Sequence, residues 1–169
     1  MAQHFLAELN GFPSTLTHSL EDGKFSLKTE KIFAIKYISP VIMFPETYSL
    51  DISDNRKVKN LEHLKKLKKL KRLTLTRCHS LTDFKFLKNM KLQYLSLEGT
   101  FIRNLEVLRK MPLRELALGA LGLELIPLNS CPDLKKLTVA RRRYPKNTLI
   151  FLNKSVKVYY RGHKTPVLR

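Results

Sequence analysis

The sequence predicts an α/β fold, namely a right-handed solenoid of five to six rungs with a parallel β-sheet on its concave face and an N-terminal cap. Three observations predict it. A motif of leucine, any residue and then Leu, Ile or Val recurs in five evenly spaced copies, the steps between copies are 23, 22, 21 and 21 residues, and the 169-residue chain can bury one substantial core. The motif copies start at Leu50, Leu73, Leu95, Leu116 and Leu137.

A longer form of the motif, L-x-x-L-x-L, begins at Leu70, Leu92 and Leu113, and a near match begins at Leu134 and ends in Val139. Each such unit is one short strand and a return arc, and it cannot bury its apolar face alone, so neighbouring units must stack. This spacing is typical of leucine-rich repeats. We expect an N-terminal capping segment over 1–46, a leucine-rich repeat domain over 47–160 and a basic tail over 161–169.

The capping segment does not show the repeat. Asp22-Gly23 is a turn signal between two short alternating segments, 17–20 and 25–27, and predicts a β-hairpin. Residues 32–38 resemble a strand that ends at Pro40. A cap is expected because the first rung of a solenoid would otherwise expose its apolar end. A separate functional element, or the end of a truncated upstream domain, is the alternative.

Strand side chains alternate, so the residues between the core leucines should line the concave face. One predicted column consists of Asp51, Thr74, Ser96, Ala117 and Thr138, and the next of Ser53, Thr76, Glu98, Gly119 and Ala140. These columns predict a shallow, hydroxyl-rich strip that is nearly neutral. The candidate protein-binding residues on and beside it are Tyr48, Asp51, Arg72, Thr74, Tyr94, Ser96, Glu98, Glu115 and Lys136.

After each strand, one core position should turn the chain into its return arc. These positions hold Asn55, Cys78, Thr100 and Leu121. An asparagine at such a bend can satisfy backbone groups that the strand leaves unpaired, and Thr or Cys does so less completely. Because only the first bend has Asn, we expect a slightly irregular ladder. Three prolines (Pro112, Pro127 and Pro132) disfavour long helices in the later arcs.

The formal charge is +18, and two blocks hold the excess. Residues 56–72 contain nine basic side chains and one acid, and residues 135–169 contain eleven and none. A solvated convex face and a hydrophilic end cap explain these blocks. The alternative is binding of nucleic acid or another polyanion through both blocks, with tyrosines 144, 159 and 160 stacking on bases, and the first block could equally bind an acidic protein. The candidate polyanion-binding residues are Arg141, Arg142, Arg143, Lys146 and Arg161.

Five leucines, at 61, 64, 67, 70 and 73, recur at every third residue of the first basic block. On a continuous α-helix they would spread over about 240° and form no single apolar stripe, which argues against a membrane-surface helix. A short convex helix over Leu61 to Leu67, followed by a break into the strand near Leu70, would bury all five.

Enzyme chemistry has little support in the sequence. The five histidines are scattered without metal-ligand spacing, and neither a G-x-S-x-G motif nor a phosphate-binding glycine loop occurs. We expect no enzymatic activity, no cofactor, no metal and no membrane contact. The lack of a targeting signal predicts a cytoplasmic protein. Cys78 and Cys131 belong to different rungs, too far apart for a disulfide, and should be reduced packing residues.

The segment 101–116 resembles the repeat of bacterial leucine-rich repeat domains, in particular those attached to planctomycete-type serine/threonine kinases. Gly99-Thr100 matches the bend of that repeat and Met111-Pro112-Leu113 its return. The resemblance implies a recognition scaffold for protein–protein interaction with an unidentified protein partner. No G-x-G-x-x-G and no H-R-D motif occurs, so kinase activity is not implied. A regulatory fragment of a multidomain signalling protein is the other alternative.

Overall fold

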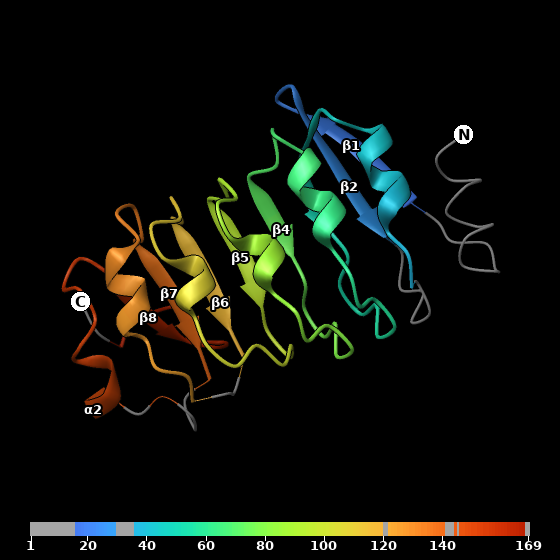
Figure 1. Cartoon of the computed structure of the whole chain (residues 1–169). Coiled ribbons are helices and arrows are strands. Elements are labelled where there is room, and N and C mark those ends of the chain that lie inside the picture. The colour runs from blue at the N-terminus through green and yellow to red at the C-terminus, as the bar shows by residue number, and fades with distance from the viewer. Residues whose placement is uncertain (1–15, 30–35, 120–121, 141–143, 145, 168–169) are drawn as a thin grey trace.

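A computed structural model describes residues 16–29, 36–119, 122–140, 144 and 146–167. These residues form one eight-stranded sheet whose strands lie side by side in chain order (Figure 1). The strands are β1 (Leu16–Glu21), β2 (Lys24–Thr29), β3 (Thr47–Asp51), β4 (Arg72–Thr74), β5 (Tyr94–Leu97), β6 (Glu115–Leu118), β7 (Lys136–Val139) and β8 (Lys157–Tyr160).

The sheet begins with the expected hairpin. Strands β1 and β2 are antiparallel, and the two residues between them, Asp22 and Gly23, have φ values of 49° and 69°. Two consecutive positive φ values are typical of the tight turn that suits the twist of paired strands. The strand expected over 32–38 lies partly outside the described residues, and its described part, 36–38, is not a strand.

From β2 onward every neighbouring pair of strands is parallel. The register brings the motif leucines into one row across β3 to β7, and Val158 of β8 continues it. These leucines, Leu50, Leu73, Leu95, Leu116 and Leu137, are at most 1% exposed. The predicted core row is therefore confirmed.

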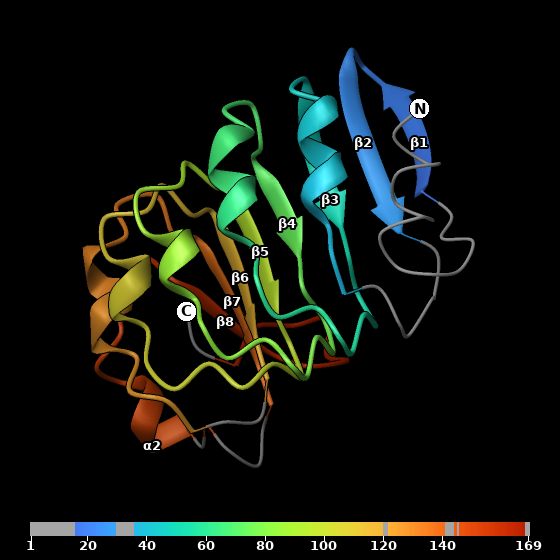
Figure 2. The same cartoon turned by 45° about the vertical axis from the view of Figure 1, so that its right-hand side comes forward.

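Short 3-10 turns, rather than α-helices, make up the return arcs on the other side of the core (Figure 2). They are η1 (Ser39–Met43), η2 (Glu62–Lys66), η3 (Lys85–Leu87), η4 (Glu106–Leu108) and η5 (Ile126–Ser130). Within the described residues the one α-helical element is the single turn α2 (Lys146–Leu149). The helical half of the α/β class was thus overestimated, because each arc has room for only one or two turns.

A side chain starts each of the three central turns. The carboxamide oxygen of Asn60 accepts a bond from the backbone N–H of Glu62 at 2.8 Å, and Asp83 does the same for Lys85 at 2.9 Å. Asn104 and Glu106 repeat the contact at 3.3 Å. Asn and Asp often bond to the backbone two residues on and so favour a turn. These side chains place successive arcs in equivalent positions.

The leucines of the first basic block show why a 3-10 turn suits this sequence. A 3-10 helix has three residues per turn, so every third side chain faces the same way. Leucines 61, 64, 67, 70 and 73 are all buried, between 0% and 3% exposed. The expectation that a short turn followed by a break buries all five is confirmed.

Three of the four bends behave as their side chains predict, and the fourth, at Leu121, lies outside the described residues. Asn55 Nδ2 donates to the carbonyl oxygens of Ile52 at 2.8 Å and Ser53 at 3.2 Å. At the equivalent positions Cys78 Sγ donates one bond, to Ile52 O at 3.2 Å, and Thr100 Oγ1 donates one, to Leu97 O at 2.8 Å. Burial raises the pKa of the Cys78 thiol to about 12, so the thiol is neutral at physiological pH. Both cysteines are buried and unpaired, as expected.

We expect Leu95→Ala to lower the free energy of unfolding by about 2 to 5 kcal/mol, because the rungs on either side prevent collapse around the cavity. Chemical denaturation followed by circular dichroism measures the change. Arg103→Ala is the control: this exposed side chain should alter stability by less than about 0.5 kcal/mol. A Leu95→Ala variant as stable as the control would contradict the stacked core.

Gly119 provides a second test of the stacking. A Cβ at this position would lie 2.8 Å from the backbone nitrogen of Gly99 in the preceding repeat, so the two backbones would have to separate. We expect Gly119→Ala to destabilise the fold by about 1 to 3 kcal/mol, measured by thermal unfolding. Ala117→Ser, on the same part of the chain and partly exposed, is the control. Equal melting temperatures would show that the rungs approach less closely.

Candidate functional site

The side chains of β3 to β8 that point away from the core form what we name the open face of the sheet. They are the residues just before and just after each core leucine, and the register aligns them in two rows. The first row contains Ser49, Arg72, Tyr94, Glu115, Lys136 and Lys157. The second contains Asp51, Thr74, Ser96, Ala117, Thr138 and Tyr159.

Side-chain pairs link the first row from strand to strand. The Arg72 guanidinium carbon lies 4.2 Å from the centre of the Tyr94 ring. Further along, Lys136 Nζ lies 3.2 Å from Glu115 Oε2 and 5.7 Å from the centre of the Tyr159 ring. The open face therefore carries aromatic rings whose cationic neighbours already hold them in place.

Tyr94 is the central aromatic side chain of this row. It is partly buried between Arg72 and Glu115. Burial raises the pKa of its hydroxyl, partly offset by the nearby Arg72 charge. The hydroxyl is therefore neutral at physiological pH and can donate or accept a hydrogen bond.

Tyr48 is not in this row, which corrects the predicted border of the site. The residue aligned with Arg72 is Ser49, because it directly precedes the core Leu50 as Arg72 precedes Leu73. Tyr48 lies one position earlier and contacts the hairpin instead, where Lys24 Nζ is 5.4 Å from its ring centre. The sequence could have shown this, because Tyr48 lies two residues before Leu50, whereas Arg72 lies one residue before Leu73.

Two residues of the second row, Asp51 and Ser96, are held in local hydrogen bonds. Asp51 Oδ1 accepts from the backbone N–H of Ser53 at 2.9 Å and from its hydroxyl at 2.5 Å. Ser96 Oγ lies 3.0 Å from Thr76 Oγ1, and Ser96 is only 3% exposed. A partner would not reach Ser96 without displacing its neighbours, so its predicted contact role is wrong. Thr74 remains partly exposed.

A long-range ion pair crosses the end of the open face. Arg161 Nη2, just after β8, lies 3.4 Å from Glu98 Oε2, just after β5. Gly119 and Ala140 occupy the same position after the two strands in between, and their small size leaves room for the arginine side chain. The sequence assigned Glu98 to protein binding and Arg161 to polyanion binding, whereas the structure pairs them.

Two of the tyrosines that accompany the remaining polyanion candidates are buried. Arg141, Arg142 and Arg143 lie outside the described residues, as does the side chain of Lys146. Tyr144 and Tyr160 are 2% and 6% exposed. The Tyr144 hydroxyl oxygen accepts a bond from the backbone N–H of Leu123 at 2.7 Å.

These burials change the base-stacking alternative. Tyr160 pairs with Val139 in a core row, and Tyr144 is packed inside, so neither can stack on bases. Tyr159 alone of the three tyrosines lies on the open face. Alternation along the last strand already predicted Tyr159 on the concave side, but the burial of Tyr144 and Tyr160 was not predicted.

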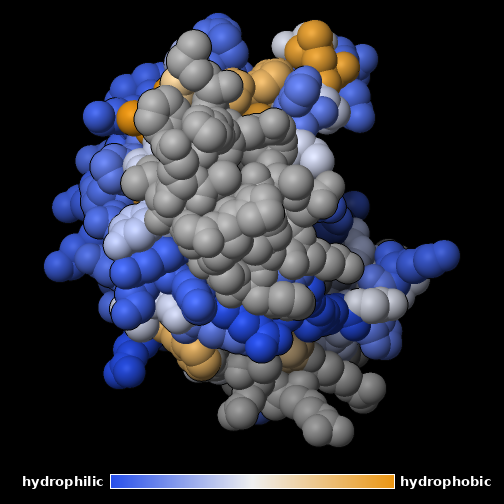
Figure 3. Space-filling view, turned by 90° about the vertical axis from the view of Figure 1, so that its right-hand side faces the viewer, coloured by the Kyte–Doolittle hydropathy of each residue, from blue (hydrophilic) through white to orange (hydrophobic). Residues whose placement is uncertain are grey.

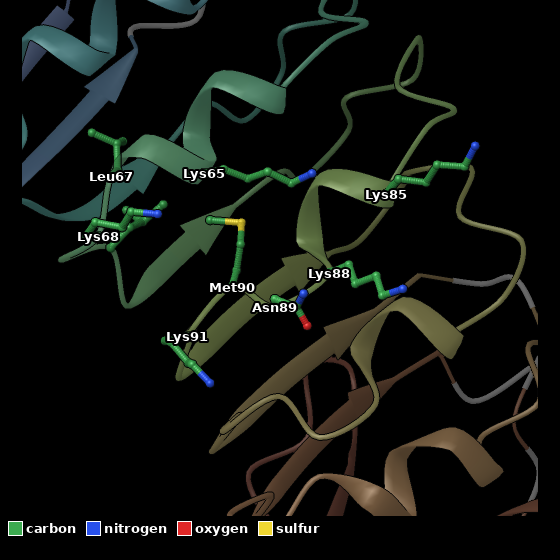
Figure 4. Close-up of a pocket in the computed structure, with 9 residues that line it drawn as sticks. Lys65, Leu67, Lys68, Lys85, Lys88, Asn89, Met90 and Lys91 are labelled. Atoms are coloured by element: carbon green, nitrogen blue, oxygen red, sulfur yellow. The ribbon is translucent and has the colours of Figure 1, made fainter.

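A second cluster was predicted only in part, because Lys65 and Lys68 belong to the first basic block whereas its other lysines follow in the next repeat. It is a groove of about 600 Å³ between the arcs of η2 and η3 (Figure 4). Its lining consists of Lys65, Leu67, Lys68, Leu70, Lys85, Lys88, Asn89, Met90 and Lys91. Residues 73–133 as a whole are nearly balanced in charge, with eight basic and six acidic side chains, which hid the local excess.

Within the described ranges, no group of three His, Cys, Asp or Glu side chains converges as metal ligands would. No described helix combines the length and the apolar character needed to cross a bilayer. The coloured surface in Figure 3 is mostly hydrophilic, with apolar atoms in small patches near its upper and lower edges.

Comparison with known proteins identifies the fold. No known protein family and no curated protein sequence matches the chain. Among solved structures it is similar to internalin C2 from Listeria monocytogenes, with a TM-score of 0.57 and 21% identity over 75% of this chain. An internalin (inlF) from the same bacterium aligns with a TM-score of 0.48 and 19% identity over 74% of this chain and 44% of its own.

The chain spans 57% of the internalin C2 chain. At this identity the likeness concerns the fold alone. Internalins are bacterial leucine-rich repeat proteins, and the in-row leucines and parallel sheet described above agree with that architecture. The chain has the leucine-rich repeat fold.

Proposed function

We propose that this chain is a non-enzymatic scaffold that binds a protein partner through the open face of its sheet. The observation that supports this most is a pair of side-chain groups on the open face: Arg72 lies on Tyr94, and Lys136 contacts both Glu115 of the first row and Tyr159 of the second row. Tyrosine and arginine are enriched among the residues that dominate protein interfaces. Side chains already held in place lose less conformational entropy when a partner binds.

The second row supplies the floor of the proposed site. Thr74, Ala117 and Thr138 are small and partly exposed, so a partner could lie flat against the strands between the larger side chains of the first row. Tyr94 and Arg72 would be the anchors, because they lie near the centre of the parallel strands. Asp51, Glu98, Glu115 and Lys136 would contribute a rim of mixed, predominantly acidic charge that favours one orientation of the partner.

We further propose the finer architecture. A right-handed solenoid of five to six rungs is supported by the six parallel strands β3 to β8. The hairpin supports a capping role for residues 1–46, followed by the repeat domain over 47–160 and the tail over 161–169. Two unpaired cysteines support a cytoplasmic location. A specific link to planctomycete-type kinase proteins, or to any multidomain signalling protein, stays a prediction.

The test replaces both anchors. We expect Tyr94→Ala with Arg72→Ala to weaken the binding of a partner recovered with the immobilised wild-type chain by about tenfold or more, a loss of at least about 1.4 kcal/mol. Isothermal titration calorimetry with the purified partner measures it. The matched control, Phe101→Ala with Arg103→Ala, removes another aromatic and arginine, both exposed. Unchanged affinity in the anchor variant would exclude the open face.

The polyanion alternative makes a different prediction about the basic tail. Binding through phosphates weakens by roughly 10³- to 10⁵-fold between about 50 and 200 mM salt, and loses about one unit of salt slope for each contact removed. We expect changing Arg141, Arg142 and Arg143 to Ala to leave partner affinity unchanged. If the wild-type chain instead binds duplex DNA with a steep slope that this triple variant flattens, the tail is a nucleic-acid site.

A further inference from the structure

We propose that the groove between the η2 and η3 arcs is a second binding site, which takes an extended acidic protein segment carrying an apolar residue. The proposal rests on the chain being a protein-interaction scaffold, but it concerns a surface separate from the open face. Five lysines and three apolar side chains make up almost all of the groove lining. Figure 4 shows that they come from two successive arcs.

Repeat stacking aligns the lysines. Leu64 and Leu87 are equivalent, because their carbonyl oxygens accept the same bond three residues on, from Leu67 N at 3.0 Å and Met90 N at 3.1 Å. In both arcs a lysine directly follows the residue that accepts this bond, and another directly follows the residue that donates it. Lys65 therefore corresponds to Lys88, and Lys68 to Lys91, in neighbouring rungs. Because the two arcs belong to neighbouring rungs, the like charges line the two sides of one groove.

Acidic side chains do not balance this charge. None of the residues lining the groove is acidic. Lys65 pairs with Glu62 at 2.6 Å. Among the described residues, the side chains of Lys68, Lys85, Lys88 and Lys91 make no ion pair. Like charges held together destabilise a fold unless a counter-charge arrives, and an anionic ligand supplies it.

The lysine columns are confined to these two arcs. In the arc of η1 the two equivalent positions hold Ile42 and Pro45, and in the arc of η4 they hold Arg109 and Pro112. Arg109 is already paired with Glu106 at 2.5 Å. A face that is basic only for solubility would spread its lysines over all the arcs. The concentration in one groove favours a local ligand.

The chemistry of the lining favours a peptide over nucleic acid. No aromatic side chain lines the groove, so unpaired bases would have nothing to stack on. No arginine lines it either, so a bidentate grip on phosphate is missing. Leu67, Leu70 and Met90 line the groove together with the lysines, and lysine methylene chains can pack against an apolar side chain of a ligand while their ammonium groups meet carboxylates. The groove volume is in the usual range for ligand sites.

The experiment measures fluorescence anisotropy of the full chain with a labelled peptide in which one leucine is flanked by glutamates. We expect Lys85→Glu with Lys88→Glu to weaken binding by about tenfold or more, because it reverses charge at the groove rim. The matched control is Lys57→Glu with Lys59→Glu, which makes the same change in net charge at exposed positions outside the groove. Replacing the peptide leucine by glycine should also weaken binding by about tenfold.

Several outcomes would overturn the proposal. Absence of peptide binding, or an equal loss in the groove and control variants, would mean that the overall +18 charge acts without a site. Tighter binding of duplex DNA or inorganic polyphosphate, lost in the same groove variant, would make the site one for phosphates. The Tyr94→Ala and Arg72→Ala variant should bind the peptide like the wild type. That result separates failure of this site from failure of the open face.

Discussion

The fold depends on the in-register stacking of one leucine from each repeat. A strand as short as β4, with three residues, cannot be stable alone, because it forms too few backbone hydrogen bonds and buries too little apolar area. Its stability comes from the strands on both sides, which share the row of Leu50, Leu73 and Leu95. The stability of such an array is a sum of the stabilities of single repeats and of the contacts between neighbours. The spacing of this leucine row therefore also sets the spacing of equivalent side chains on the surface.

Much of the fold could be predicted from that row. The leucine positions fix which side chains are buried, and the turn residues Asp22 and Gly23 fix the hairpin. The type of return arc was less predictable, because apolar periodicity is usually interpreted with the α-helical repeat in mind. The three-residue spacing of the leucines from 61 to 73 in fact matches the 3-10 turn that the structure contains.

The open face was predictable one strand at a time, since alternation alone places Arg72, Tyr94, Glu115 and Lys136 on it. Contacts between distant strands were not, and Glu98 with Arg161 is the clearest case. The burial of Tyr144 and Tyr160 was also not predicted, because nearby arginines do not show whether a tyrosine faces the core or the solvent. The lysine groove could not be predicted from the charge of any one segment. Its lysines come from equivalent positions of two successive repeats, which the fold brings together.

The ion pair between Arg161 and Glu98 has a consequence for how this array could change in length. A whole repeat inserted between β5 and β8 would preserve the leucine row, since each rung needs only a like neighbour. It would also move the two charged groups apart by about another 4.8 Å, beyond the reach of a side chain that already crosses Gly119 and Ala140. The leucine row sets no limit on the number of inner rungs. The ion pair does, because Arg161 can reach Glu98 only when two rungs lie between their strands.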